Sequence, residues 1–237
     1  NAQPKEDFTI MKYVVVGTSH AGYAAIETLL ISDPEAEIEV FESAETPSFL
    51  SCGIQSYLED VAPSLQSLHY ADAESLKEQG VNLHLQTTVT DLDTQNKTVT
   101  IKKDGNTSEV SYDKLFLSPG AVPNELPING INEYNNVLFM RGEEWAGKIK
   151  ERMQHAKKAI VVGGGYIGIE AAEAFTKAGI DTTLMDDHDR IINTYLDKEF
   201  TDILEKNIAE HGLKFKGNAS VKALKADDNN NVTAVVT

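Results

Sequence analysis

The chain has 237 residues, with 37 acidic and 21 basic side chains, a formal net charge of −16 and one cysteine. The acidic balance argues against a nucleic-acid binder, whose affinity rests on clustered Lys and Arg. One cysteine excludes an internal disulfide framework and a Cys-rich zinc ribbon, and we expect no metal site. No segment approaches the ~20 apolar residues of a membrane span. We therefore expect a cytoplasmic protein, in which a lone thiol stays reduced.

The first ten residues carry no fold signal. They are mostly polar and precede a Met-Lys-Tyr sequence that starts at Met11. They lack the apolar core of a signal peptide. We interpret residues 1–10 as an upstream extension or a cloning remnant.

Two stretches of the chain repeat one pattern. In the first, an apolar run at 12–16 leads into a glycine turn at 17–22, a helical stretch to about Ile31 and a second apolar run that ends in Glu42. The same features recur in the second stretch, at 159–162, 163–168, 169–177 and 182–186. A strand, a glycine turn, a helix and a second strand form a βαβ unit of a parallel sheet. We predict an α/β protein with two Rossmann-like three-layer domains, both incomplete here.

The remaining elements follow from shorter patterns. Val-rich and Thr-rich runs bounded by turn residues predict strands, here at 81–85, 88–92, 98–102, 109–112, 114–117, 213–216, 220–225 and 232–236. Apolar spacing predicts helices at 143–154 and 196–211. Prolines and Gly130 make 119–135 the expected connection between a first domain at 11–125 and a second at 136–237. Because the chain stops on its last strand, we expect it to be part of a longer protein.

The glycine turns have the spacing of dinucleotide sites. In such a site the first glycine permits the tight turn, the second lets a pyrophosphate approach the backbone, and the third lets helix and strand pack closely. An acid at the end of the second strand accepts hydrogen bonds from ribose hydroxyls. The second stretch fills these positions with Gly163, Gly165, Gly168 and Asp186, and the first with Gly17, Ser19, Gly22 and Glu42. Ser19 is a small substitute for the middle glycine. The alternative is a purely structural strand-to-helix turn.

The acid of the second stretch indicates which nucleotide is bound. Asp186 favours NAD(H), because a 2′-phosphate would meet its carboxylate. Arg190 is nearby, but Asp187 and Asp189 flank it. We therefore predict no 2′-phosphate site at Arg190.

Two reactive side chains remain. Cys52 precedes a predicted helix at 53–59, and a helix N-terminus stabilises the reactive thiolate. The alternative is a small buried side chain. His20 lies inside the first glycine turn, where it is either functional or a structural histidine.

Five motifs occur in order along the chain: GTSHAGY at 17–23, SFLSCG at 48–53, LSPGAVP at 117–123, GGGYIGIE at 163–170 and YLDKEF at 195–200. Through them, residues 11–237 resemble the amino-terminal half of the pyridine nucleotide-disulfide oxidoreductase family, in its single-cysteine branch. Within that branch the chain is most similar to the FAD-dependent NADH peroxidases and NADH oxidases of bacteria.

The resemblance implies cofactors and roles. The first domain would bind FAD and the second NADH. Cys52 would be the redox centre that cycles between thiolate and sulfenic acid, and His20 its polar neighbour at the peroxide site. The implied cofactor contacts are Gly17, Ser19, His20, Ala21, Gly22, Glu42, Cys52, Ser118, Pro119, Gly120, Gly163, Gly165, Tyr166, Ile167, Gly168, Glu170 and Asp186. Among these, Tyr166 and Glu170 would line the nicotinamide side of the flavin.

The implied reaction passes hydride from NADH through the flavin and the cysteine centre to hydrogen peroxide, or to oxygen, and yields water. The residues support the one-cysteine chemistry independently, because a sulfenic acid at Cys52 has no intrachain thiol with which to condense. Two alternatives stay open, a coenzyme A-disulfide reductase and a non-catalytic nucleotide-binding redox module. The resemblance also implies a homo-oligomer formed through a C-terminal domain beyond Thr237. We expect the 237-residue chain alone to bind FAD weakly and to be a poor catalyst.

Overall fold

The computed structural model describes residues 10–237, so the interpretation of residues 1–9 lies outside it. The described chain forms two compact units. The first comprises residues 10–50 and 69–121, and the second residues 51–68 and 122–237.

A four-stranded parallel sheet is the centre of the first unit. Its strands are β1 (Lys12–Val16), β2 (Glu37–Phe41), β3 (Asn82–His84) and β7 (Lys114–Leu117), in the order β3-β2-β1-β7. The chain runs outward from β1 to β3 on one side and returns with β7 on the other. The strand order therefore reverses between β1 and β7.

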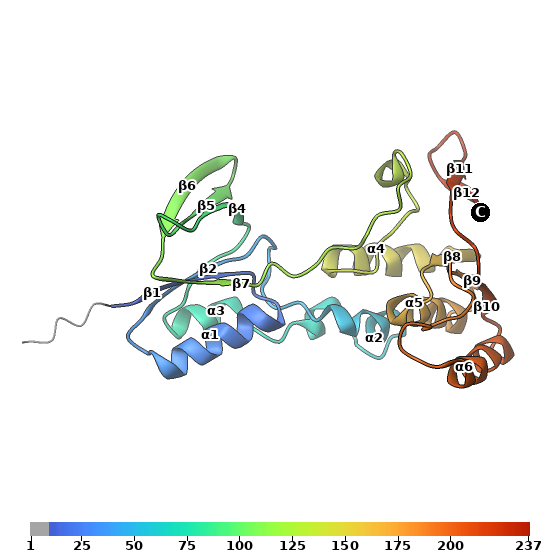
Figure 1. Cartoon of the computed structure of the whole chain (residues 1–237), viewed down its shortest axis with the longest axis horizontal. Coiled ribbons are helices and arrows are strands. Elements are labelled where there is room, and N and C mark those ends of the chain that lie inside the picture. The colour runs from blue at the N-terminus through green and yellow to red at the C-terminus, as the bar shows by residue number, and fades with distance from the viewer. Residues whose placement is uncertain (1–9) are drawn as a thin grey trace, which may run out of the picture. The chain divides into compact units, whose positions relative to one another are not determined.

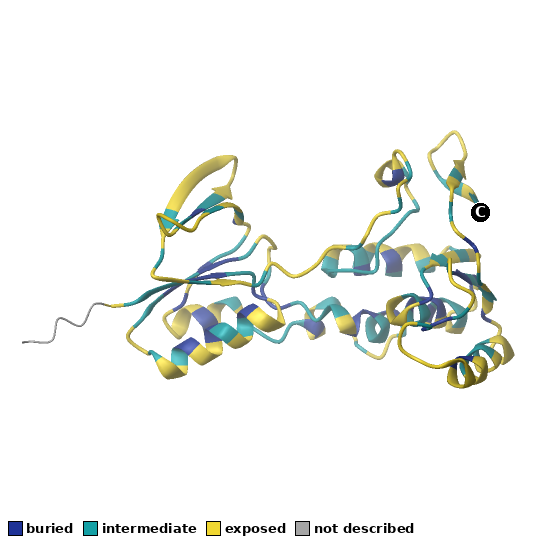
Figure 2. Cartoon of the chain, viewed as in Figure 1, coloured by how far each residue is buried: buried dark blue, intermediate teal, exposed yellow. Residues whose placement is uncertain are grey.

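Alternating side chains of β1 and β2 build a core on each face of this sheet. Val15 and Val40 face helices α1 (His20–Ser32) and α3 (Ala73–Glu78). Val14 and Phe41 face the antiparallel sheet of β4 (Thr88–Asp93), β5 (Thr98–Lys103) and β6 (Asn106–Ser111). Figure 1 shows the helices and this second sheet on opposite sides of the parallel strands, and Figure 2 shows the buried residues between them. The period-2 alternation of a strand thus produces three layers.

The second unit contains a three-stranded parallel sheet in the order β10-β9-β8, formed by β8 (Lys158–Val162), β9 (Asp181–Met185) and β10 (Lys214–Lys216). Helices α5 (Tyr166–Lys177) and α6 (Lys198–Glu210) belong to its core, in which Ala172, Leu184 and Ile191 are buried. A hairpin of β11 (Ala223–Ala226) and β12 (Val232–Val236) follows.

The segment that carries the cysteine belongs to the second unit. It contains the 3-10 turns η1 (Ser51–Gly53) and η2 (Leu65–Leu68) and the short helix α2 (Ile54–Leu58). Lys150, on helix α4 (Glu143–Met153), donates from Nζ to the carbonyl oxygen of Leu58 at 2.7 Å and pairs with Asp60. Side chains of α4 and α5 form hydrogen bonds with this segment. The expected domain bounds, 11–125 and 136–237, remain a prediction. The cofactor assignment of each domain remains a prediction.

The predicted fold class is confirmed, because both units are built on parallel sheets with strand–turn–helix connections. The ends of β7 and β12 coincide with the predicted ones, whereas α1 and α5 begin inside their glycine turns. Helix α3 was not predicted, and the third 3-10 turn η3 (Ile131–Glu133) lies in the predicted connection. None of the helices in residues 10–237 is both long enough and apolar enough to cross a bilayer.

Candidate functional site

The first glycine turn lies against the turn that follows β7. Gly17 has a φ of +88°, and a Cβ placed on it would be 2.2 Å from the carbonyl oxygen of Ser118. The backbone N–H of Ser118 donates to the carbonyl oxygen of Val16 at 2.9 Å. The structure thus brings the predicted residues Gly17 and Ser118 together at the reversal between β1 and β7. Ligands of open α/β sheets bind at such a reversal, beyond the carboxyl ends of the strands. Pro119 and Gly120 follow in the same turn.

Glu42, which follows β2, is held by the glycine turn itself. Its Oε2 accepts hydrogen bonds from the backbone N–H of Thr18 at 2.9 Å and from Thr18 Oγ1 at 2.7 Å. Its Oε1 accepts from the backbone N–H of Ala44 at 2.9 Å. Thr18 is fully buried. Thr18 is not among the predicted site residues, although its hydroxyl follows the first glycine directly in the sequence and Glu42 ends the second strand.

The start of α1 carries the other predicted residues of the first turn. His20 and Ala21 are its first two residues and are exposed, and Ser19 is the N-cap, without a side-chain capping bond. A Cβ on Gly22 would be 1.9 Å from the carbonyl oxygen of Gly17. Close packing therefore requires the third glycine whether or not a ligand binds.

The second glycine turn repeats this geometry with one informative difference. A Cβ on Gly168 would lie 1.8 Å from the carbonyl oxygen of Gly163, which matches the relation in the first unit. At Gly165, by contrast, a Cβ would meet no atom within 4 Å. Its backbone dihedrals, φ −79° and ψ −175°, are open to any residue. Packing therefore accounts for Gly168 but not for Gly165, whose bare backbone faces open space at the start of α5.

Asp186, directly after β9, forms hydrogen bonds through both of its carboxylate oxygens. Its Oδ2 accepts the backbone N–H of Gly164. Its Oδ1 accepts the backbone N–H of His188 at 2.8 Å and lies 2.8 Å from His188 Nδ1. Burial raises the pKa of Asp186, but the hydrogen bonds from Gly164 and His188 outweigh it and leave that pKa below its ordinary value. The carboxylate is therefore ionised at neutral pH and fixed beside the turn.

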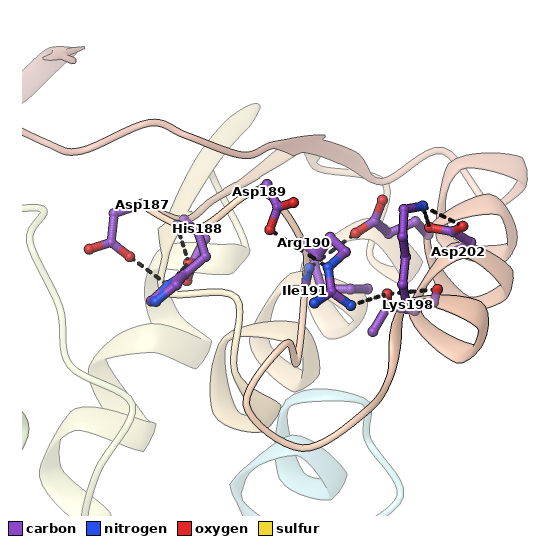
Figure 3. Close-up of polar contacts among 10 residues, drawn as sticks. Asp187, His188, Asp189, Arg190, Ile191, Lys198 and Asp202 are labelled. Carbon is purple, nitrogen blue, oxygen red and sulfur yellow. Dashed lines mark hydrogen bonds and ion pairs between the residues drawn. The ribbon is translucent and has the colours of Figure 1, made fainter.

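The neighbouring charges pair with one another. Figure 3 shows His188 directed toward Asp187, 2.8 Å from its Oδ1, whereas Arg190 is directed toward α6. Arg190 donates to Thr201 Oγ1 at 3.1 Å, and its Nε lies 3.6 Å from Asp189. The guanidinium is thus engaged with Thr201 and Asp189, and the absence of a 2′-phosphate site remains a prediction. Asp186, Asp187 and His188 could also converge on a cation, but their ligand atoms are paired with each other and we assign no metal.

Aromatic and apolar side chains lie exposed at the start of α5. Tyr166 and Ile167 are about half exposed, and the ring of Tyr166 lies 4.9 Å from that of Tyr195. Glu170, one turn further along α5, is partly buried. Tyr195 lies in a predicted motif without a predicted role, since ring contacts between distant residues leave no periodic signal in the sequence.

Cys52 is an exposed free thiol in the 3-10 turn η1. The helix expected at 53–59 is present as Ile54–Leu58, which has only five residues. In the first unit, the ring of His20 lies 5.1 Å from that of Tyr70. The structure describes Cys52 and His20 in separate units, so their predicted pairing at a peroxide site remains a prediction.

Comparison with known proteins places this geometry in a family. The family model described as "Pyridine nucleotide-disulphide oxidoreductase" matches residues 11–237. An NADH oxidase of Enterococcus faecalis is 42% identical over 229 residues, which cover 96% of this chain and 51% of that protein. An NAD(P)H coenzyme A polysulfide/persulfide reductase of Pyrococcus horikoshii is 33% identical, with 84% of this chain and 45% of that protein covered.

A solved structure shows the same fold. The water-forming NADH oxidase of Lactobacillus brevis, bound to NADH, matches with a TM-score of 0.89 and 34% identity, covering 95% of this chain and 52% of that one. The chain therefore spans about half the length of the relatives it matches.

Proposed function

Because the chain belongs to the pyridine nucleotide-disulphide oxidoreductase family, we propose that its first glycine turn binds FAD and its second binds NAD(H). We further propose that the protein oxidises NADH with oxygen or hydrogen peroxide as the acceptor. The observation that carries the nucleotide site is the contrast at the second turn. Packing demands Gly168, whereas Gly165 has open space where a Cβ would stand, and a pyrophosphate needs such bare backbone at a helix start.

The residues of each turn fit the proposed nucleotide. At the second turn, the N-terminus of α5 offers free backbone N–H groups and partial positive charge to a pyrophosphate. The fixed, ionised carboxylate of Asp186 would accept a ribose hydroxyl. At the first turn, the N-terminus of α1 would supply the backbone N–H groups and Glu42 the fixed carboxylate. Ser118, which follows β7, lies beside Gly17 at the edge of this turn. Bound FAD would supply the two-electron relay between NADH and the acceptor.

Cys52 would act as the redox centre in this proposal. Its exposure leaves the thiol accessible to a small oxidant. The thiolate would attack one oxygen of hydrogen peroxide, so that an S–O bond forms as the O–O bond breaks and hydroxide leaves as water after protonation. The sulfenic acid would persist, since the sequence holds no second cysteine. His20 would hold the peroxide oxygens in this scheme.

The names of the relatives change which electron acceptor should be tested first. Hydrogen peroxide is the first acceptor expected from the sequence, but two relatives that are 42% and 36% identical are named NADH oxidases, and the Lactobacillus brevis enzyme is named water-forming. Oxygen is therefore the first acceptor to test. The persulfide reductase relative keeps a coenzyme A disulfide as the second candidate, with Cys52 forming the mixed disulfide. A cytoplasmic location and a homo-oligomer remain predictions.

The test is NADH consumption by the purified whole protein, not by the 237-residue chain alone, supplied with FAD, in the presence of oxygen, hydrogen peroxide or coenzyme A disulfide. We expect the wild type to reduce oxygen to water. The Cys52→Ser variant should still consume NADH with oxygen but release hydrogen peroxide, and it should lose turnover with added peroxide. Undiminished peroxide turnover in Cys52→Ser would contradict the role of Cys52. A flavin spectrum without NADH oxidation by any acceptor would favour the non-catalytic alternative.

A further inference from the structure

The ring of His188 is hydrogen-bonded to the carboxylate of Asp186, the group that the proposed function assigns to the adenosine ribose. His188 Nδ1 and the backbone N–H of His188 both lie 2.8 Å from Asp186 Oδ1. The other oxygen, Oδ2, accepts the backbone N–H of Gly164. An ionised carboxylate offers about four lone-pair positions. Three are thus in use before a ribose hydroxyl arrives.

The main chain around His188 is held without the help of the ring. The carbonyl oxygen of His188 accepts the backbone N–H of Asn218 at 2.8 Å, and the carbonyl oxygen of Asp186 accepts that of Ala219, also at 2.8 Å. The His188 side chain itself is 54% exposed, against 14% for Asp186. The ring can therefore leave the carboxylate while the loop keeps its position.

Two acids determine the electrostatic environment of this ring. Nδ1 of His188 lies 2.8 Å from Asp187 Oδ1 as well as from Asp186. Asp189, the next acid along the chain, pairs with Arg190. Protonation of the ring therefore strengthens its hold on Asp186.

We propose that His188 competes with the adenosine ribose of NADH for Asp186, and so makes NADH affinity depend on the protonation of its ring. This inference rests on the proposed NADH site. One position remains on Oδ2, so a ribose that donates from both of its hydroxyls needs a second position, which becomes available on Oδ1 when Nδ1–H leaves; the protonated ring resists that exchange more than the neutral ring does. NADH binding then releases a proton, and by linkage NADH lowers the affinity of His188 for that proton.

The direction of the pH dependence follows from this competition. The hydrogen bond to Asp186 and the charge of Asp187 raise the pKa of His188 above its ordinary value of 6.5. NADH affinity should increase as the pH rises through that range. For an exposed ion pair we expect the dissociation constant to change by about two- to fivefold between about pH 6 and about pH 8.5.

The test is a fluorescence titration of the purified chain with NADH at both pH values. His188→Gln keeps a hydrogen-bond donor but cannot become charged, so its affinity should be independent of pH and higher than that of the wild type at the lower pH. His211→Gln is the matched control, because His211 is an exposed histidine of the same unit whose Nδ1 lies 2.8 Å from a backbone carbonyl oxygen, that of Asn207. It should keep the wild-type profile.

A second measurement separates this role from a structural one. Saturation with NADH should lower the pKa of the His188 ring, followed by NMR. An unchanged or higher pKa, or a His188→Gln variant with the wild-type pH profile, would overturn the competition. The variant Asp186→Asn distinguishes the two proposals. If NADH does not bind the wild type, or binds the Asp186→Asn variant as tightly as the wild type, the proposed NADH site is wrong. If the Asp186→Asn substitution weakens NADH binding but the His188→Gln substitution leaves it unchanged, only the proposed competition is wrong.

Discussion

Gly168 lies directly against the carbonyl oxygen of Gly163, so that a Cβ on Gly168 would come within 1.8 Å of it. Gly22 and Gly17 stand in the same relation at 1.9 Å. Side chains do not approach backbone this closely, since a carbon and an oxygen repel strongly well before that distance. In each unit the helix therefore starts beside the strand only because this position is glycine.

Gly168 and Gly165 of the second turn should respond differently to replacement by alanine. Gly168→Ala should reduce the free energy of unfolding by about 1–3 kcal/mol, because the added methyl group overpacks a rigid backbone contact. Gly165→Ala should leave stability nearly unchanged, since its Cβ meets nothing within 4 Å, but it should weaken NADH binding by obstructing the pyrophosphate. Urea denaturation and NADH titration of both variants measure this. Wild-type NADH affinity in Gly165→Ala would argue against a pyrophosphate at this position.

Thr18 and Glu42 allow a test of the first turn. Thr18→Val keeps the shape of the buried side chain but removes the Oγ1 donor to Glu42, so we expect a loss of about 1 kcal/mol in stability and weaker FAD binding. Thr28→Val is the matched control, because Thr28 Oγ1 donates to the carbonyl oxygen of Ala24 on the exposed side of α1. Equilibrium unfolding and flavin absorbance give the two quantities. Equal losses of stability and of FAD binding in both variants would contradict a specific role of Thr18.

The ion pair between Glu59 and Lys177 should hold the cysteine segment within the second unit. Lys177 Nζ lies 2.9 Å from Glu59 Oε2, and Gln55 donates to Glu173 Oε2 at 3.0 Å. Since Lys177 is half exposed, Lys177→Met should cost no more than about 1 kcal/mol. We expect its main effect to be faster hydrogen exchange of the α2 amides, measured by mass spectrometry.

A lysine in a pair remote from this contact serves as the control for Lys177. Lys206 pairs with Glu210 within α6 at 3.9 Å, and both side chains are exposed. Lys206→Met should leave exchange in α2 unchanged. If both variants accelerate that exchange alike, the tether from Lys177 is not what orders α2.

Asp186 should contribute to stability in a defined pH range. Its pKa is lower in the folded chain than its ordinary value, because the hydrogen bonds from Gly164 and His188 outweigh the effect of burial. The contribution is complete above the unfolded-state pKa of about 3.9 and is lost as the pH falls through the lower folded-state pKa. In acid unfolding followed by circular dichroism, Asp186→Asn should start less stable at neutral pH and lose less stability on acidification than the wild type. Parallel curves would contradict the contribution of Asp186.

Much of the fold could be predicted from local patterns. β7 and β12 have the predicted bounds, because short apolar runs bounded by turn residues have few alternatives as strands. The six-residue helix α3 escaped prediction, since its N-cap bond from the backbone N–H of Ser75 to Asp72 and one buried leucine make too short a pattern. The grouping of 51–68 with the second unit also escaped prediction, because the hydrogen bond from Lys150 to Leu58 and the ion pair between Lys177 and Glu59 join residues more than 90 positions apart.

The sequence by itself determined the two βαβ units, the glycine spacing of both turns and the acid that ends each second strand, since these features follow from local periodicity and from the small size of glycine. Only the tertiary structure decided how those acids are used. Glu42 is held by Thr18, and Asp186 is shared between Gly164 and His188. Hydrogen bonds across 22 to 24 residues form only when the turn folds over the end of the neighbouring strand, which local sequence does not encode.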